Sequence, residues 1–169
     1  MSRAFVREDD SDNASDLPEL PLSPHPNYVT HSGLAQLHAR LSTLQQELAE
    51  LDSEALDIAR QRALLGRERR WLQARIASAL LRQTANPGKV DFGATVELLD
   101  DDEHRYHYRI VGEDEANPEQ GLISWRSPLA MALQGAAVGD SVLWRRPAGD
   151  LHVEVLSIDY EAPPPATEK

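Results

Sequence analysis

Leucine recurs along the first half of the chain at alternating steps of three and four residues. The positions are Leu34, Leu37, Leu41, Leu44, Leu48 and Leu51. This spacing places the side chains on one face of a helix and is typical of a coiled-coil seam. A second apolar stripe follows and stops before the helix breakers Asn86, Pro87 and Gly88; it comprises Ile58, Leu65, Leu72, Ile76 and either Ala79 or Leu80. The pattern predicts two helical arms.

The two arms form either one long helix or an antiparallel hairpin. A single helix of about 50 residues would run about 75 Å and would need a second chain to cover its seam. That alternative corresponds to a dimeric coiled coil acting as a structural adaptor. A hairpin covers the seam within one chain, and equal arms would place its reversal near residues 56–59, where no glycine or proline marks a turn. We favour the hairpin, spanning residues 30–86.

The second half of the chain has short alternating runs instead of heptads. They predict strands at residues 90–99, 105–111, 122–125, 142–145 and 151–160. Ser127 as N-cap and Pro128 at the first helical position predict a helix that ends before Gly135. Three strands, a helix and two strands are typical of an α+β domain with one helix on an antiparallel sheet. The acidic run at 100–103 lacks the spacing of a calcium loop, and we interpret it as a solvated turn.

Both ends of the chain have the composition of tails. Residues 2–26 are rich in Asp, Ser and Pro, and residues 163–165 are all proline. Such segments bury too little apolar surface to offset their ordering entropy. We therefore expect a disordered or extended segment at 1–29, the hairpin at 30–86, the sheet domain at 88–161 and a disordered tail at 162–169. With no membrane-length apolar run and no signal peptide, the expected location is the cytoplasm.

Charge is distributed unevenly along the chain. The net charge of -11 argues against a general nucleic-acid coat protein, because binding to duplex DNA depends on cations. Residues 31–89 nevertheless carry an excess of basic residues, and the second arm contains Arg60, Arg62, Arg67, Arg69 and Arg70. These arginines are either solvated flanks with cross-arm pairs, each worth a few tenths of a kcal/mol, or a surface that meets a phosphate backbone or an acidic protein channel.

The sequence contains no pattern of an autonomous active site. It has no cysteine, no Ser/His/Asp signature, no P-loop and no dinucleotide fingerprint. His104 and His107 are three residues apart in a predicted strand, so they lie on opposite faces and cannot share a metal. We expect a protein that is not an enzyme by itself and has no cofactor and no stably bound metal.

Several motifs in the second half resemble, in order and spacing, the C-terminal domain of bacterial GreA/GreB transcript cleavage factors. They are GKVDFGA at 88–94, RIVGE at 109–113, ISWRSPLAMALQG at 123–135, VGD at 138–140, RPAGD at 146–150 and VLSIDY at 155–160. The start MSRAFV and the lead-in LPLSPHPNYVT resemble the GreB side of the family. The resemblance implies an FKBP-like α+β domain preceded by an antiparallel coiled-coil hairpin.

The resemblance also implies a function in transcription elongation. The family's C-terminal domain binds the rim of the RNA polymerase secondary channel, and the hairpin tip helps to hold a catalytic Mg²⁺ with which the polymerase cleaves backtracked RNA. By this resemblance the polymerase contact falls on Arg126, Ser127 and Pro128, and the tip acids are Asp52, Glu54 and Asp57. The expected partner is RNA polymerase, nascent RNA or DNA is met only within the elongation complex, and the chain is a monomer.

Two departures from the family pattern keep other functions open. The family's tip motif is absent, although Glu54 and Asp57 keep the three-residue spacing of one helical face, and each arm is shorter by about ten residues, or about 15 Å. Arg126 also stands where the family has an aspartate. A non-cleaving secondary-channel regulator, similar to the nucleoside diphosphate kinase regulator proteins, is the first alternative. A peptidyl-prolyl isomerase is the weakest, since only Phe92, Trp125 and Trp144 would line its pocket.

Overall fold

The computed structural model describes residues 17–51, 56–84 and 86–161. The chain divides into two compact units, and each unit combines two stretches of sequence. The helical unit contains the described parts of Met1–Pro24 and Leu37–Ser78, and the sheet unit contains His25–Gln36 and the described part of Ala79–Lys169. The sheet unit therefore includes residues 25–36 and 79–84, most of which the sequence analysis assigned to the hairpin.

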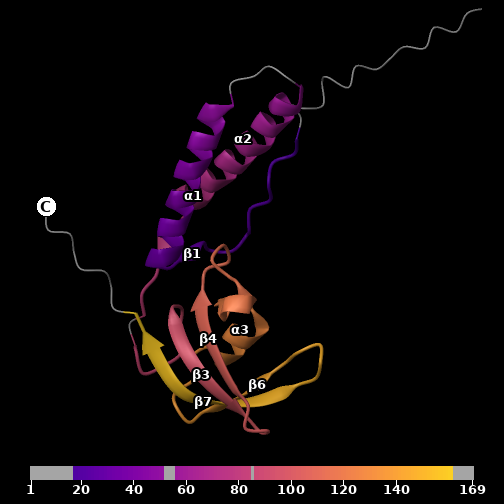
Figure 1. Ribbon diagram of the computed structural model, residues 1–169. Coiled ribbons are helices and arrows are strands. Elements are labelled where there is room, and N and C mark those ends of the chain that lie inside the picture. Colours follow the sequence, from indigo (N-terminus) through magenta and orange to yellow (C-terminus); the bar gives the residue numbers. More distant parts are fainter. Residues whose placement is uncertain (1–16, 52–55, 85, 162–169) are drawn as a thin grey trace, which may run out of the picture. The chain divides into compact units, whose positions relative to one another are not determined.

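Two antiparallel helices form the helical unit and lie side by side in Figure 1. Helix α1 (His31–Glu50) and helix α2 (Leu56–Ala77) meet along the predicted seam, where Leu44 and Leu72 are buried. Arg40 of α1 donates two hydrogen bonds to Glu68 of α2, at 2.7 and 2.9 Å. The predicted hairpin is confirmed, but the expected reversal at 56–59 is wrong because α2 already begins at Leu56.

A segment near the N-terminus lies along the outer side of α2 (Figure 1). The Nη1 of Arg67 donates to the Pro18 carbonyl at 3.3 Å, and the indole Nε1 of Trp71 donates to the Pro21 carbonyl at 3.2 Å. Arg70 forms an ion pair with Glu19 at 2.7 Å. A disordered or extended segment was predicted here, and residues 17–27 form no helix or strand. Residues 17–24 belong to the helical unit, where arginine and tryptophan donors of α2 hold them.

Five strands form the sheet of the second unit, in the order β5-β4-β3-β7-β6. Their bounds are β3 Ala94–Asp100, β4 Arg105–Val111, β5 Leu122–Ser124, β6 Ser141–Trp144 and β7 Leu151–Tyr160. All neighbouring strands are antiparallel except β4 and β5, which are parallel. The register between β3 and β7 shifts at Glu97 and Leu98. The predicted α+β fold is confirmed. The parallel pair of β4 and β5 departs from the predicted antiparallel sheet.

Helix α3 (Pro128–Leu133) covers one face of the sheet and closes its core (Figure 1). Burial alternates strictly along β3, because successive side chains point to opposite faces of a strand. The core is aliphatic and includes Val96, Leu98, Val153 and Val155 from the sheet and Leu129 and Leu133 from α3. A core of this size therefore needs few aromatic residues.

Residues before α1 are attached to the sheet unit by backbone pairing and by a buried carboxylate. Strand β1 (Tyr28–Val29) pairs in parallel with β2 (Leu80–Leu81). The ring of Tyr28 packs edge-on against Trp125 at 5.0 Å. Glu115 is buried and accepts hydrogen bonds from the hydroxyls of Thr30, at 2.5 Å, and Ser32, at 2.6 Å. Because the Thr30 hydroxyl also accepts from the N–H of Gly33, Glu115 supports the N-terminal cap of α1.

No helix within the described ranges is long and apolar enough to cross a membrane.

Candidate protein-binding site

The turn that leads into α3 presents the three residues predicted to contact a partner. Ser127 is the N-cap of α3, and its hydroxyl oxygen accepts a hydrogen bond from the N–H of Ala130 at 3.2 Å. Pro128 follows at the first helical position, where its missing N–H leaves no hydrogen bond unmade. The Ser127 N–H donates to the Ser124 carbonyl at 2.8 Å, which closes the turn. Arg126, Ser127 and Pro128 are thus brought together on a rigid loop.

Arg126 is exposed and stacks on a neighbouring aromatic ring. Its guanidinium carbon lies 5.4 Å from the centre of the Trp125 ring, a cation–π geometry. The Trp125 ring also makes an edge-type contact with the ring of Tyr28. No carboxylate among the described residues forms an ion pair with the Arg126 side chain. The charge of Arg126 is therefore available to a partner, and its position is restrained by the tryptophan.

The surface around this turn is short of charge. Residues 121–139 contain only one charged side chain, that of Arg126. Pro128 is exposed, and the apolar side chains of Met131 and Val138 are 52% and 59% exposed. Charged residues are depleted and Met and Arg are enriched at the centres of protein interfaces. Residues 121–139 therefore have the composition of a protein-binding surface, although the sheet unit that contains them is acidic.

The predicted basic arm is present on α2, but its arginines do not point in one direction. Arg60, Arg62, Arg69 and Arg70 are exposed and Arg67 is half-buried. Arg62 donates to the Leu51 carbonyl, and Arg70 pairs with Glu19, which raises the pKa of Arg70 through this hydrogen bond. At 100° per residue Arg60, Arg67 and Arg70 share the outer face, whereas Arg62 and Arg69 flank the seam. The cross-arm pair of the hairpin uses Arg40 of α1, which sequence reasoning did not single out.

Of the three predicted tip acids, one is described. Asp57 lies exposed in the first turn of α2, where a carboxylate is favoured by the helix dipole. Asp52 and Glu54 lie outside the described residues. Carboxylate oxygens are suitable ligands for Mg²⁺. However, no group of three or more His, Cys, Asp or Glu in the described part of the chain is arranged to hold a metal ion.

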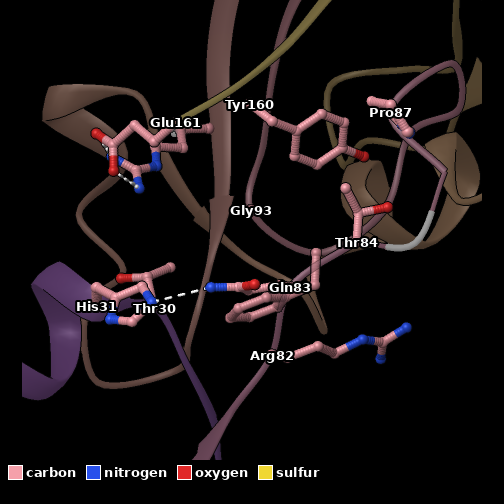
Figure 2. A pocket seen from close by; sticks show the side chains of 11 residues that line it. Thr30, His31, Arg82, Gln83, Thr84, Pro87, Gly93, Tyr160 and Glu161 are labelled. Atoms are coloured by element: carbon pink, nitrogen blue, oxygen red, sulfur yellow. Dashed lines mark hydrogen bonds and ion pairs between the residues drawn. The ribbon is translucent and has the colours of Figure 1, made fainter. Parts of the chain in front are cut away.

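A pocket of about 240 Å³ lies in the sheet unit next to the start of α1 (Figure 2). Tyr160 and Pro87 lie on one side of it, and Glu161 and His31 on the other. Arg109 and Glu161 form a bidentate pair across its wall, at 2.6 and 2.7 Å, and His31 bonds to Gln83 at 3.1 Å. Two pairs of polar side chains in the wall thus bond to one another, Arg109 with Glu161 and His31 with Gln83.

The three aromatic residues of the isomerase alternative do not all line this pocket. Of Phe92, Trp125 and Trp144, only Phe92 lines it. Trp144 packs instead against Tyr106 and Tyr108 on the sheet. Phe92 and Trp125, in contrast, both pack against the ring of Tyr28.

Comparison with known proteins identifies the family. The family model described as "Transcription elongation factor, GreA/GreB, C-term" matches residues 76–160, half of the chain. The transcription elongation factor GreA of Ruegeria pomeroyi is 33% identical over 150 residues, which cover 78% of this chain and 96% of that protein. The chain belongs to the GreA/GreB family. The resemblance inferred from the short motifs between Gly88 and Tyr160 is confirmed.

Another GreA relative matches this chain over a shorter stretch at higher identity. The GreA protein of Haemophilus ducreyi is 48% identical over 77 residues, and this chain spans about half of its length (49%). The crystal structure of GreA factor homolog 1 (Gfh1) of Thermus thermophilus aligns with 80% of this chain and 99% of its own at 24% identity and a TM-score of 0.40. The family model itself covers the 126–128 turn, which lies within residues 76–160.

Proposed function

We propose that this GreA/GreB-family protein binds RNA polymerase at its secondary channel and regulates the elongation of paused or backtracked complexes. The observation that carries the proposal is the 33% identity to a GreA over 96% of that protein's length, which includes both the hairpin and the sheet unit. A factor of this kind is an accessory to another enzyme's active site. The absence of a nucleophile–base pattern from the sequence agrees with that role.

The exposed turn before α3 supplies the docking surface in this proposal. Pro128 and Met131 offer an apolar contact, and Arg126 adds one cation held over Trp125. A rigid apolar anchor with a stacked arginine is the composition of interface hot spots. The partner surface facing Arg126 must therefore be neutral or acidic.

The docking proposal is tested by co-purification with core RNA polymerase. We expect Pro128→Glu to abolish retention, since it places an unpaired carboxylate in an apolar contact. Pro147→Glu, at an exposed proline in the turn between β6 and β7, is the matched control and should be retained. Failure of the wild-type protein to bind polymerase at all would refute the proposed partner.

Within this role, we propose that the hairpin tip assists RNA cleavage by the polymerase's own Mg²⁺. Asp57, with Glu54, would add hard oxygen ligands beside those of the polymerase, and the protein itself needs no resident metal. In stalled, backtracked complexes the wild-type protein should stimulate cleavage, and Glu54→Ala with Asp57→Ala should reduce it. Asp101→Ala with Asp102→Ala, on the sheet unit, serves as the control. Stimulation that survives loss of both tip acids would exclude this role.

A non-cleaving secondary-channel regulator is the second candidate, favoured by a specific observation. The alignment with the Ruegeria GreA runs over 150 residues but covers only 78% of this 169-residue chain, so the relative has residues that this chain lacks. The helices α1 and α2 have 20 and 22 residues, or about 30 Å each at helical rise. A metal ligand must lie about 2 Å from its ion, so a short hairpin would occupy the channel without reaching it. Polymerase binding without stimulated cleavage would identify this function.

A further inference from the structure

The N-terminal segment described above ends at the basic outer face of α2. Its direction is set by three contacts: Pro18 with Arg67, Glu19 with Arg70, and Pro21 with Trp71. Residue numbers rise together along the segment and along α2. Within the described residues the segment therefore runs parallel to α2, and Leu17 is its end nearest to the earlier turns of α2, where Arg60 lies.

Two arginines on the outer face of α2 are not neutralised by any described residue. Arg60 lies seven residues before Arg67 and so on the same face, two turns away. No carboxylate among the described residues forms an ion pair with either arginine. The Nε of Arg67 is buried without a hydrogen-bond partner in the described structure. Within the described ranges, both cations are therefore open to an anionic group.

The residues immediately upstream of this segment carry the matching charge. Residues 8–16 contain five carboxylates and no basic residue: Glu8, Asp9, Asp10, Asp12 and Asp16. Arg60 and Arg67 are about 10 Å apart along the helix axis, at 1.5 Å per residue. Nine residues extend to at most about 30 Å, so the acidic segment is long enough to cover both arginines. Its attachment through Pro18 and Glu19 raises the local concentration of its carboxylates at this face.

We propose that residues 8–16 dock on the outer face of α2, against Arg60 and Arg67, and compete there with external polyanions such as RNA. In this proposal the carboxylates of residues 8–16 take the place of the phosphates of an external polyanion. In the isolated protein the segment screens the arginine face, and an anionic partner must displace it. This inference does not depend on polymerase binding, since it concerns two parts of one chain.

Docking is tested with a spin label, which the absence of cysteine makes straightforward. A nitroxide on Ser11→Cys should broaden the amide resonances of residues 60–67 in the full-length protein. The broadening should weaken in about 0.5 M salt, where the Debye length falls to a few ångströms. A labelled variant in which the five acids are changed to Asn or Gln is the control for tethering alone. Equal broadening in both proteins and no effect of salt would refute docking.

Competition is tested with a fluorescent oligouridylate of ten nucleotides as the anionic probe. Fluorescence anisotropy at about 50 mM salt should give roughly tenfold tighter binding for the neutralised segment than for wild type, with a difference that shrinks as salt rises. The matched control neutralises five exposed acids of the sheet unit: Asp101, Asp102, Glu103, Glu119 and Asp150. Its affinity should stay near that of wild type, although its net charge changes equally. Equal gains in the two variants, or no gain in either, would refute competition.

Discussion

At the scale of single residues, one carboxylate holds the turn between β3 and β4. Asp100 is buried and accepts hydrogen bonds from the N–H of Asp102 at 2.9 Å, the N–H of His104 at 2.8 Å and the hydroxyl of Tyr106 at 2.9 Å. Burial alone would raise the pKa of Asp100, but these hydrogen bonds outweigh it and hold the pKa below 3.8. The interpretation of residues 100–103 as a solvated turn is wrong for Asp100.

We predict that Asp100→Asn lowers the melting temperature at pH 7, because the amide keeps the shape of the side chain but loses the charge that these donors stabilise. Since the pKa of Asp100 is lower in the folded than in the unfolded state, its stabilisation is fully present above about pH 4 and is lost as pH falls through the folded-state pKa. Thermal unfolding at pH 7, 5 and 3 should therefore show a difference from wild type that shrinks at the lowest pH. Asp101→Asn, at an exposed position, should have little effect at any of these pH values. A difference that grows as pH falls would contradict the prediction.

At the scale of elements, the hairpin is held by a narrow seam. Leu44 is fully buried and Leu72 is 2% exposed, while the remaining leucines of the α1 stripe are buried or half-buried. The pair between Arg40 and Glu68 is partly exposed and therefore contributes little beyond fixing the register of the arms. The stability of the helical unit should depend mainly on the apolar residues of the seam.

We predict that Leu44→Ala lowers the free energy of unfolding of the helical unit by about 2–5 kcal/mol, through lost burial and the cavity that remains. Leu64→Ala, on the same hairpin but 40% exposed, should cost much less. Urea unfolding followed by circular dichroism at 222 nm measures both changes. Similar losses for the two variants would show that the seam is not the main source of stability.

At the scale of the whole molecule, charge and function are divided between the parts of the chain. The acidic residues are concentrated in the N-terminal segment and the sheet unit, whereas α2 is basic. The total of -11 therefore says little about any one surface. The basic outer face of α2 and the nearly uncharged surface at 121–139 are suited to different partners.

We predict that the protein is a monomer, because the hairpin buries its leucine seam within one chain and leaves no seam for a second copy. Sedimentation equilibrium should give a mass near 18.8 kDa across a tenfold range of concentration. A mass of twice this value would instead support the coiled-coil adaptor.

The sequence alone determined the features that repeat along the chain. Heptad spacing identified both helices, alternation identified the strands β4 and β7, and Ser127 with Pro128 marked the start of α3. These signals are local because 3.6-residue and two-residue periods follow from backbone geometry. The motifs from Gly88 to Tyr160 were sufficient to indicate the family, since they occur in the family's order across a whole domain.

Only the tertiary structure decided which of several similar polar residues are structural. Asp100 differs from its acidic neighbours because of the donors that surround it, and Glu115 holds the capping residue Thr30, which lies 85 residues earlier. The pairing of β1 with β2 and of Glu19 with Arg70 likewise joins residues about 50 apart in sequence. Such contacts produce no periodic pattern in the sequence, because they join segments that come together only when the chain folds and do not depend on the spacing of neighbouring residues.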